Sequence, residues 1–219
     1  MKVLKLDDES GKEISKYTML FGDDEERTLL ENNLVFCSII NFNVSSEASL
    51  ASGSAEKNFK ALLMDYLGVL SDIPILPGYI ILSVGLKIKK ALEFIHAKGY
   101  AHMDVKDSNI FHNPATGQCL LGDYGSCVAI GSVIESTTAG YYPISLHGLA
   151  ARAEYDFYML AVCLCLKLEK SNNPNLPYSH FFNENGLVEK KLFDYVRGLI
   201  DSDLKALLLE LFQIKDMHL

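Results

Sequence analysis

The sequence lacks three features that would each indicate a particular class of protein: a run of lysine and arginine, a CxxC pair, and an apolar stretch long enough to cross a bilayer. The 20 Lys and Arg are outnumbered by 28 Asp and Glu, and the net charge of −8 argues against a general nucleic-acid-binding protein. The longest apolar run, Phe157 to Leu166, has about half the length of a membrane-spanning helix. We therefore expect neither nucleic-acid binding nor a membrane span.

The cysteines and the N-terminus indicate the compartment. The chain has five cysteines, an odd number, and Cys163 and Cys165 lie inside the longest apolar run, as small core residues do. Free thiols in a reducing compartment are expected, and a zinc site is not. The opening segment 1–13 is too charged for a signal peptide, so we expect a cytoplasmic or nuclear location.

With 219 residues, 49% of them hydrophobic, the chain can bury a core as one domain or as two small lobes that share a cleft. Its N-terminal part is rich in predicted strands. We predict strands at 3–6, 34–44 and 59–66, a polar, turn-rich segment at 7–16, a helix that begins at 23–26, and a loop at 45–57. A first domain over residues 1–66 is expected.

The remaining chain, 67–219, is predicted to form a second, mainly helical domain. An amphipathic helix is predicted over 77–98, because apolar residues recur every three or four positions, and Gly99 is placed to end it. The segments 110–112 and 119–121 flank a turn and predict a hairpin. Further apolar runs of helical character occupy 157–166, 192–200 and 204–212.

Four polar side chains offer a recognisable chemistry. Asp104 follows the predicted long helix in a short polar loop, where its carboxylate can orient a substrate hydroxyl. Lys106, two residues on in an extended loop, points the same way and can reach a transferring phosphate. Asn109 and Asp123 supply an amide oxygen and a carboxylate, both suited to Mg²⁺. These residues predict phosphoryl transfer from a nucleotide.

The segment His102–Asn109, HMDVKDSN, closely resembles the catalytic loop H-R-D-L-x-x-x-N of eukaryotic protein kinases. The tripeptide Asp123–Gly125 resembles their D-F-G turn, with Tyr in place of Phe. The resemblance implies that Asp104 is the catalytic base and that Lys106 contacts the phosphate. It likewise implies that Asn109 and Asp123 hold Mg²⁺, with ATP as the phosphate donor. A lysine two residues after the base is the pattern of serine/threonine kinases.

The resemblance covers nearly the whole chain. Residues 62–67 resemble the strand and hinge that hold adenine, with Met64 at the gatekeeper position. The resemblance also implies a strand lysine that contacts ATP and a helix glutamate that pairs with it. The lysine is Lys2, with Lys5 as the alternative. The implied nucleotide-site residues are Lys2, Glu26, Met64, Asp65 and Leu67.

Two supporting features follow from the same resemblance. Asp156 resembles the buried aspartate that anchors the catalytic loop. Leu30, four residues after Glu26, is expected to stack with His102 and Tyr124 as part of a regulatory spine. The expected fold is therefore α+β: a protein-kinase-like bilobal fold with a reduced antiparallel β N-lobe and a mainly α-helical C-lobe.

Three departures from the kinase pattern bear on activity. No G-x-G-x-x-G occurs, and only Met1 precedes Lys2, so we expect either an N-terminally shortened kinase or a missing part on another chain or an upstream segment. Met103 replaces the arginine that would pair with an activation-loop phosphate, so we expect no activation by that route. The segment 138–144 lacks the glutamate of A-P-E, and 210–219 lacks an arginine to pair with it.

Three functions remain open on the sequence. The first is an ATP-dependent serine/threonine protein kinase that acts on protein substrates. The second is a catalytically weak or inactive, pseudokinase-type interaction domain that binds a protein partner, favoured by the missing glycine-rich loop. The third is a small-molecule kinase of the aminoglycoside or choline type, against which Lys106 and the segment 138–143 argue. The oligomeric state is not predicted.

Overall fold

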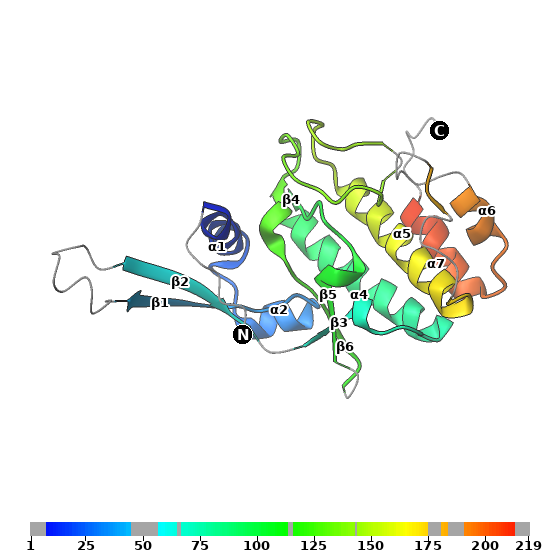
Figure 1. Ribbon diagram of the computed structural model, residues 1–219, viewed down its shortest axis with the longest axis horizontal. Coiled ribbons are helices and arrows are strands. Elements are labelled where there is room, and N and C mark those ends of the chain that lie inside the picture. Colours follow the sequence, from blue (N-terminus) through cyan, green and yellow to red (C-terminus); the bar gives the residue numbers. More distant parts are fainter. Residues whose placement is uncertain are drawn as a thin grey trace.

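The computed structural model of the protein describes residues 8–44, 57–64, 67–113, 116–142, 144–174, 181–183 and 191–212. Figure 1 shows a helical body made of α4, α5 and α7 beside a smaller N-terminal part of two helices and one hairpin. The predicted opening strand at 3–6 lies outside the described residues. The predicted domain division at 66 and 67 stays a prediction.

The N-terminal part begins with the helices α1 (Asp8–Phe21) and α2 (Glu26–Glu31). The prediction of a turn-rich segment at 7–16 is wrong, because Ile14, Tyr17 and Phe21 recur at helical spacing and are all buried. The high polarity of the segment hid this apolar face. The helix predicted from 23–26 is the short α2, whose buried residue is Leu29.

The strands β1 (Ser38–Val44) and β2 (Lys57–Leu63) form an antiparallel hairpin in which Ser38 pairs with Leu63. They confirm the strands predicted at 34–44 and 59–66, within a few residues at each end. The hairpin extends away from the helical body, with α1 beside its base (Figure 1). Leu34, just before β1, forms a parallel bridge to Leu121, so the hairpin is joined to the strands that carry the functional loops.

A three-stranded sheet, in the order β3–β5–β6, connects the two parts of the molecule. It consists of β3 (Gly68–Val69), β5 (Ile110–Asn113) and β6 (Gln118–Leu121). The predicted hairpin of β5 and β6 is confirmed, with Ile110 opposite Leu121. A separate pair, β4 (Tyr100–Ala101) and β7 (Val128–Ala129), brackets the loops that lie between them.

The helical body consists of α4 (Gly78–Ala97), α5 (Ala153–Asn172), α6 (Lys191–Arg197) and α7 (Ser202–Phe212). The predicted long helix is confirmed as α4, which follows Pro77 and ends before Gly99 at a φ of 84°. Gly85 lets this helix approach its neighbours closely: a Cβ there would lie 2.7 Å from Leu207 and 2.8 Å from Leu164. Among the described residues, no helix has the length and apolarity to cross a bilayer.

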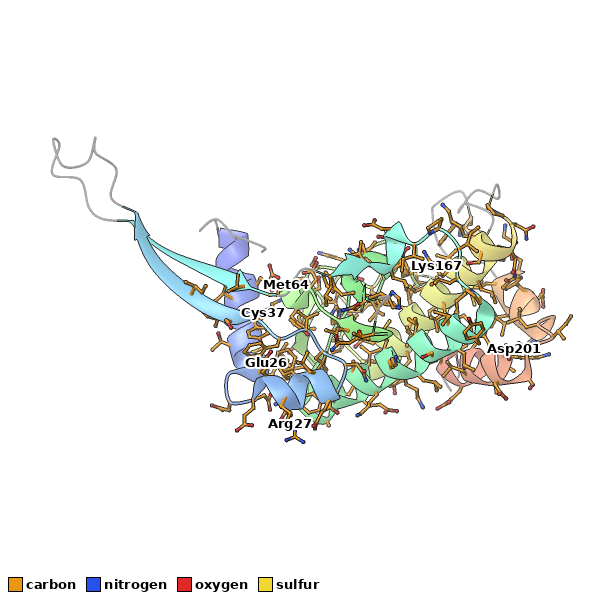
Figure 2. All side chains as sticks on the ribbon, turned by 90° about the horizontal axis from the view of Figure 1, so that it is seen from below. Glu26, Arg27, Cys37, Met64, Lys167 and Asp201 are labelled. Atoms are coloured by element: carbon orange, nitrogen blue, oxygen red, sulfur yellow. The ribbon has the colours of Figure 1, made fainter. Side chains whose placement is uncertain are left out.

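The segment that leads into α4 is fastened to α5 by a buried lysine. The ammonium of Lys167 donates to the carbonyl of Leu70 over 2.7 Å and also to the carbonyl of Ile73. Burial lowers the pKa of Lys167, and the charge of Asp107 acts in the opposite direction. Figure 2 shows Lys167 within the helical body, far from the hairpin. The contact holds residues 70–73 (η1 and the residue after it) against the side of the body that supports the catalytic loop.

Candidate functional site

The loop after β4 is held in place by a fully buried carboxylate of α5. Asp156 accepts hydrogen bonds from the backbone N–H groups of His102 and Met103, each over 2.7 Å. His96 on α4 contacts the same carboxylate through Nε2 at 2.8 Å. These contacts confirm Asp156 as the anchor predicted from the sequence. They also stabilise Met103 at a φ of 64°, a conformation that non-glycine residues rarely adopt.

Asp104 follows this anchored pair and is the centre of a hydrogen-bond cluster. The ammonium of Lys106 lies 2.8 Å from Oδ2, and the amide Nδ2 of Asn109 lies 3.0 Å from the same oxygen. The other carboxylate oxygen, Oδ1, accepts from the backbone N–H of Thr138 at 3.1 Å and from its hydroxyl at 2.5 Å. Lys106 also donates to the Thr138 hydroxyl over 2.7 Å. Both oxygens of the carboxylate are thus fixed in direction.

The electrostatics of the cluster keep Asp104 ionised. Burial of the carboxyl raises its pKa, but the hydrogen bonds from Lys106 and Thr138 lower it, and the net result is a pKa below the ordinary 3.8. At neutral pH, Asp104 is therefore a carboxylate that accepts hydrogen bonds. The positive charge that balances it is on Lys106, two residues along the chain.

Asp123 lies beside Asn109 because β5 and β6 run antiparallel. The N–H of Gly122 donates to the carbonyl of Asn109 over 3.0 Å, so residues 109 and 122 lie opposite each other. Asp123 adopts a left-handed conformation, with φ 61° and ψ 75°. The amide of Asn109 also donates to the carbonyl of Asp104 over 2.8 Å, which turns its Oδ1 away from that residue. The structure therefore brings all four predicted chemical residues into one region.

The donor types of this region fit the metal ion predicted from the sequence. Magnesium prefers hard oxygen ligands and is often held by one or two carboxylates and neighbouring oxygens. Asp123 supplies a carboxylate and Asn109 an amide oxygen, from positions just after β6 and just before β5, two strands that pair with each other. The described residues contain no cluster of three or more His, Cys, Asp or Glu with metal-binding geometry, so a third protein carboxylate is not provided here.

Tyr124, the middle residue of the turn, joins the loop to α1 through aromatic contacts. Its ring centroid lies 4.9 Å from that of Phe21, 5.8 Å from that of Tyr17 and 5.9 Å from that of His102. The predicted stacking of His102 with Tyr124 is confirmed. Tyr17 and Phe21 of α1 also supply rings that contact Tyr124. The predicted part of Leu30, which lies on α2, in this stack stays a prediction.

Two phenolic hydroxyls strengthen this contact. The hydroxyl of Tyr124 lies 2.7 Å from the carbonyl of Leu121 and 3.1 Å from that of Val35. The hydroxyl of Tyr17 accepts the backbone N–H of Cys37 over 2.8 Å. Phenylalanine has no hydroxyl, so a phenylalanine at position 17 or 124 could not form these hydrogen bonds. The turn is therefore fixed to both α1 and the start of the hairpin.

A cleft of about 380 Å³ lies near the base of the hairpin. Three predicted nucleotide-site residues line it: Met64 after β2, Leu67 before β3, and Glu26 at the start of α2. Figure 2 shows Met64 and Glu26 on this side of the molecule. Apolar Val35 and Leu120 also line the cleft. The residues of the catalytic loop do not line it, so the cleft and the Asp104 cluster are separate features.

Two predicted nucleotide-site residues, Lys2 and Asp65, and the alternative Lys5 lie outside the described residues. A different candidate for the helix glutamate emerges from α1. Glu13 lies four residues before Tyr17, the same spacing that separates Glu26 from Leu30. Because α1 is the helix that packs on Tyr124, Glu13 lies on the element next to the turn, and Glu26 lies on the element next to the cleft.

Thr138 is the functional residue that sequence reasoning missed. Only a tertiary contact brings it to Asp104, 34 residues earlier. The one signal in the sequence is its place at the start of the segment 138–144, which corresponds to the A-P-E region of kinases and does not by itself indicate a contact with Asp104. Thr138 thus joins the catalytic loop, at Asp104, to the segment 138–144.

The segment after Thr138 borders a second cleft of about 270 Å³, lined among others by Ala139, Tyr142 and Leu146. Tyr142 anchors it to α5: its ring lies 4.9 Å from that of Tyr155 and 4.7 Å from that of Tyr158. Tyr142 is buried. An aromatic cluster therefore fastens this segment where the sequence lacks the glutamate–arginine pair.

Comparisons with known proteins agree with this geometry. No protein-family model matches the chain. A 140-residue stretch, 55% of the chain, is 31% identical to the serine/threonine-protein kinase ArnS of Sulfolobus acidocaldarius, and it covers 21% of that kinase. A 65-residue stretch, 29% of the chain, is 42% identical to the Wee1-like protein kinase of Arabidopsis thaliana and covers 13% of it. The chain therefore matches only a small part of these relatives.

Solved structures of protein kinases share the fold. Vaccinia related kinase 3 superposes with a TM-score of 0.56 at 19% identity, over 92% of this chain and 65% of that one. The PK-1 kinase of Cydia pomonella granulovirus gives a TM-score of 0.55 at 18% identity, over 92% of this chain and 75% of that one. The chain has a protein-kinase-like fold, and the resemblance to protein kinases predicted from the sequence is confirmed.

Proposed function

We propose that this chain, whose fold is that of protein kinases, transfers the terminal phosphoryl group of ATP to serine or threonine hydroxyls of protein substrates. The observation that carries the proposal is the convergence of Lys106, Asn109 and Thr138 on the two oxygens of Asp104. Because phosphoryl transfer depends on positioning and electrostatic stabilisation, a pre-oriented carboxylate beside an ammonium supplies what the reaction requires.

In this proposal, Asp104 accepts a hydrogen bond from the substrate hydroxyl and takes its proton as the oxygen attacks the γ-phosphorus. The bond from that phosphorus to its bridging oxygen breaks, and ADP leaves with the bridging oxygen. Lys106, whose ammonium is shared between Asp104 and Thr138, supplies positive charge for the transferring phosphoryl oxygens. The low pKa of Asp104 keeps its carboxylate ready to accept the hydroxyl.

Asn109 and Asp123 hold Mg²⁺ in this proposal. The metal ion supplies charge neutralisation for the phosphates. In this proposal the two side chains present their oxygens from the turn before β5 and the turn after β6, and the aromatic contacts of Tyr124 keep the second turn in place. We also propose that the helix glutamate expected to pair with the strand lysine is Glu13 on α1 and not Glu26 on α2, because α1 is the helix that contacts the turn.

We assign the adenine base to the cleft lined by Met64 and Leu67. Most of the residues that line it are apolar, and the amide of Gln118 and the hydroxyl of Ser38 offer polar partners. A flat heterocycle fits such a lining better than a triphosphate does, because the carboxylate of Glu26 at its edge repels phosphate. The phosphates would then lie toward Lys106 and Asp123. A cytoplasmic location of the protein remains part of the proposal.

The test is transfer of radiolabelled phosphate from ATP to a generic basic protein substrate in the presence of Mg²⁺. We expect label on serine or threonine with the wild-type chain and a loss of at least a hundredfold in Asp104→Asn, because removal of a general base costs about that factor or more. Asp107→Asn, on the next turn of the loop, is the matched control and should retain activity. Equal incorporation by wild type and Asp104→Asn would refute the assignment.

A second candidate, a non-catalytic interaction domain of the pseudokinase type, is favoured by one observation. Both oxygens of Asp104 already accept two hydrogen bonds each, which occupies about four lone-pair sites of an ionised carboxylate. A substrate hydroxyl must displace one of these donors.

Metal-dependent nucleotide binding distinguishes the two candidates. A kinase should show a thermal shift with ATP that requires Mg²⁺ and is lost in Asp123→Ala, together with phosphate transfer. A non-catalytic domain should show no transfer at any Mg²⁺ concentration, whether or not it binds nucleotide. Binding without transfer in the wild-type chain would therefore favour the second candidate.

A further inference from the structure

Lys16 on α1 makes a contact that the chemistry described so far does not use. Its ammonium donates to the backbone carbonyl of Gly125 over 2.6 Å, across 109 residues of sequence. Lys16 is half-buried. Gly125 ends the turn that begins with Asp123, so the lysine reaches directly into the segment that presents the proposed metal ligand.

The carboxylate of Asp123 lies next to the same glycine. A Cβ built on Gly125 would lie 3.4 Å from Asp123 Oδ1, so the side chain folds back over the turn. The ammonium of Lys16 and the carboxylate of Asp123 are thus both neighbours of Gly125. The charges of both residues also act on the thiol of Cys127, two residues further along, Lys16 lowering its pKa and Asp123 raising it, although burial has the larger effect and raises it.

The contact between Lys16 and Gly125 restrains the backbone conformation of Asp123. The residue adopts a left-handed conformation that a non-glycine residue holds only when its surroundings impose it. On one side of the turn, Tyr124 is fixed by aromatic rings and by its hydroxyl. On the other side, the carbonyl of Gly125 is fixed by Lys16. Without the lysine, one end of the turn loses its charged hydrogen-bond partner.

We propose that Lys16 is a positioning residue for the metal ligand Asp123: its hydrogen bond to the carbonyl of Gly125 holds the 123–125 turn in the conformation that binds Mg²⁺ and nucleotide. The proposal rests on the proposed function, because Mg²⁺ is assigned to Asn109 and Asp123 there. It extends that function by naming a side chain outside the catalytic loop that holds the metal ligand in place.

The experiment compares Lys16→Met, which keeps the aliphatic stem, with Lys16→Arg, which keeps a charged donor, in the full chain. Met19→Gln is the matched control on the same helix, because Met19 is 50% exposed. The first readout is the Mg²⁺ concentration that gives half of the ATP-dependent thermal shift. We expect Lys16→Met to raise it about tenfold, equivalent to about 1.4 kcal/mol, and the other two variants to stay within about twofold of wild type.

The second readout does not need nucleotide. Cys127 is buried immediately after the turn, and its backbone N–H donates to Tyr124 over 3.1 Å, so a thiol reagent reaches it only when the turn opens. Its labelling rate, measured by mass spectrometry, should rise about tenfold in Lys16→Met. The rates of Cys163 and Cys165, buried in α5, should stay unchanged.

Unchanged Mg²⁺ dependence and unchanged Cys127 labelling in Lys16→Met would overturn the proposal. An equal rise at all three cysteines would also overturn it, because it would show global destabilisation. If the wild-type chain shows no Mg²⁺-dependent binding, the proposed function fails, and the labelling experiment alone decides whether Lys16 holds the turn. Lys16→Gln carries the same comparison if Lys16→Met does not fold.

Discussion

The hydroxyl of Tyr124 gives the sharpest test of how the functional turn is stabilised. Tyr124 is 2% exposed, and its hydroxyl reaches the carbonyls of Leu121 at 2.7 Å and Val35 at 3.1 Å. Tyr124→Phe removes this oxygen and leaves the aromatic contacts in place. Because a hydroxyl has one proton, the two contacts share one hydrogen bond, and their contributions should not be added.

The magnitude follows from what each carbonyl loses. The carbonyl of Leu121 still accepts the N–H of Val35 over 2.9 Å, so it keeps a donor. The carbonyl of Val35 loses the hydroxyl. One net hydrogen bond contributes about 1 kcal/mol, and a buried acceptor that loses its donor costs about 1–3 kcal/mol. The removed hydroxyl no longer needs to be desolvated, which offsets part of this loss. We expect Tyr124→Phe to lower the free energy of unfolding by about 1–2 kcal/mol.

The assay is equilibrium unfolding in urea, followed by circular dichroism. The midpoint should fall while the slope with denaturant stays constant, because the surface exposed on unfolding does not change. Tyr79→Phe is the matched control, because Tyr79 is 69% exposed and the same substitution there should change stability by less than about 0.5 kcal/mol. A Tyr124→Phe protein with the stability of the control would show that the hydroxyl does not stabilise the turn.

The remaining predictions concern the anchoring carboxylate of Asp156, the hydroxyl of Thr138, and the dependence of the free energy of unfolding on acidic pH. Asp156→Ala should lower the free energy of unfolding by about 3 kcal/mol or more, measured by thermal unfolding, because two backbone N–H groups and His96 lose a buried acceptor. A loss below about 1 kcal/mol would contradict the anchoring role of Asp156. Thr138→Val should lower kcat/KM for peptide phosphorylation about tenfold while Thr138→Ser retains it, since the side chain reaches Oδ1 of Asp104 and Nζ of Lys106 through its hydroxyl, and the backbone N–H contact to Oδ1 remains in both variants. Equal rates in Thr138→Val and wild type would contradict a role of Thr138 in the site. The depressed pKa of Asp104 means that its ionised form stabilises the fold above the ordinary pKa of 3.8, and that this contribution disappears as pH falls through the lower folded-state pKa. Stability measured from pH 6 down to pH 2 should therefore fall less steeply in Asp104→Asn than in wild type, and parallel curves would contradict the pKa direction.

The functional residues that lie close together in sequence could be predicted well. Asp104, Lys106 and Asn109 share one loop, and their spacing alone indicates a common site, which the hydrogen bonds around Asp104 confirm. The long helix α4 was also predictable, because its buried residues recur at helical spacing between a proline and a glycine. In these cases the short-range pattern and the tertiary environment favour the same conformation.

The helix α1 shows where this kind of reasoning stops. Its segment contains charged and polar residues at most positions, so that local composition favours a turn, but four buried residues, Ile14, Tyr17, Leu20 and Phe21, bind it to the turn and the hairpin. The stability of such a helix comes from packing and is not visible in propensity. The sequence pattern therefore points to Glu26 and Leu30 of α2, and the packed face of α1 is visible only in the structure.

The sequence alone determined the chemistry: a carboxylate, an ammonium and two oxygen ligands in the order and spacing of protein kinases, and with them the class of fold. The tertiary structure decided which partners complete that chemistry, because Thr138 reaches Asp104, and Lys16, Tyr17 and Phe21 reach the 123–125 turn, across 34 to 109 residues. Contacts over such separations depend on how helices and strands pack together, and a pattern within one segment carries no information about the packing partner.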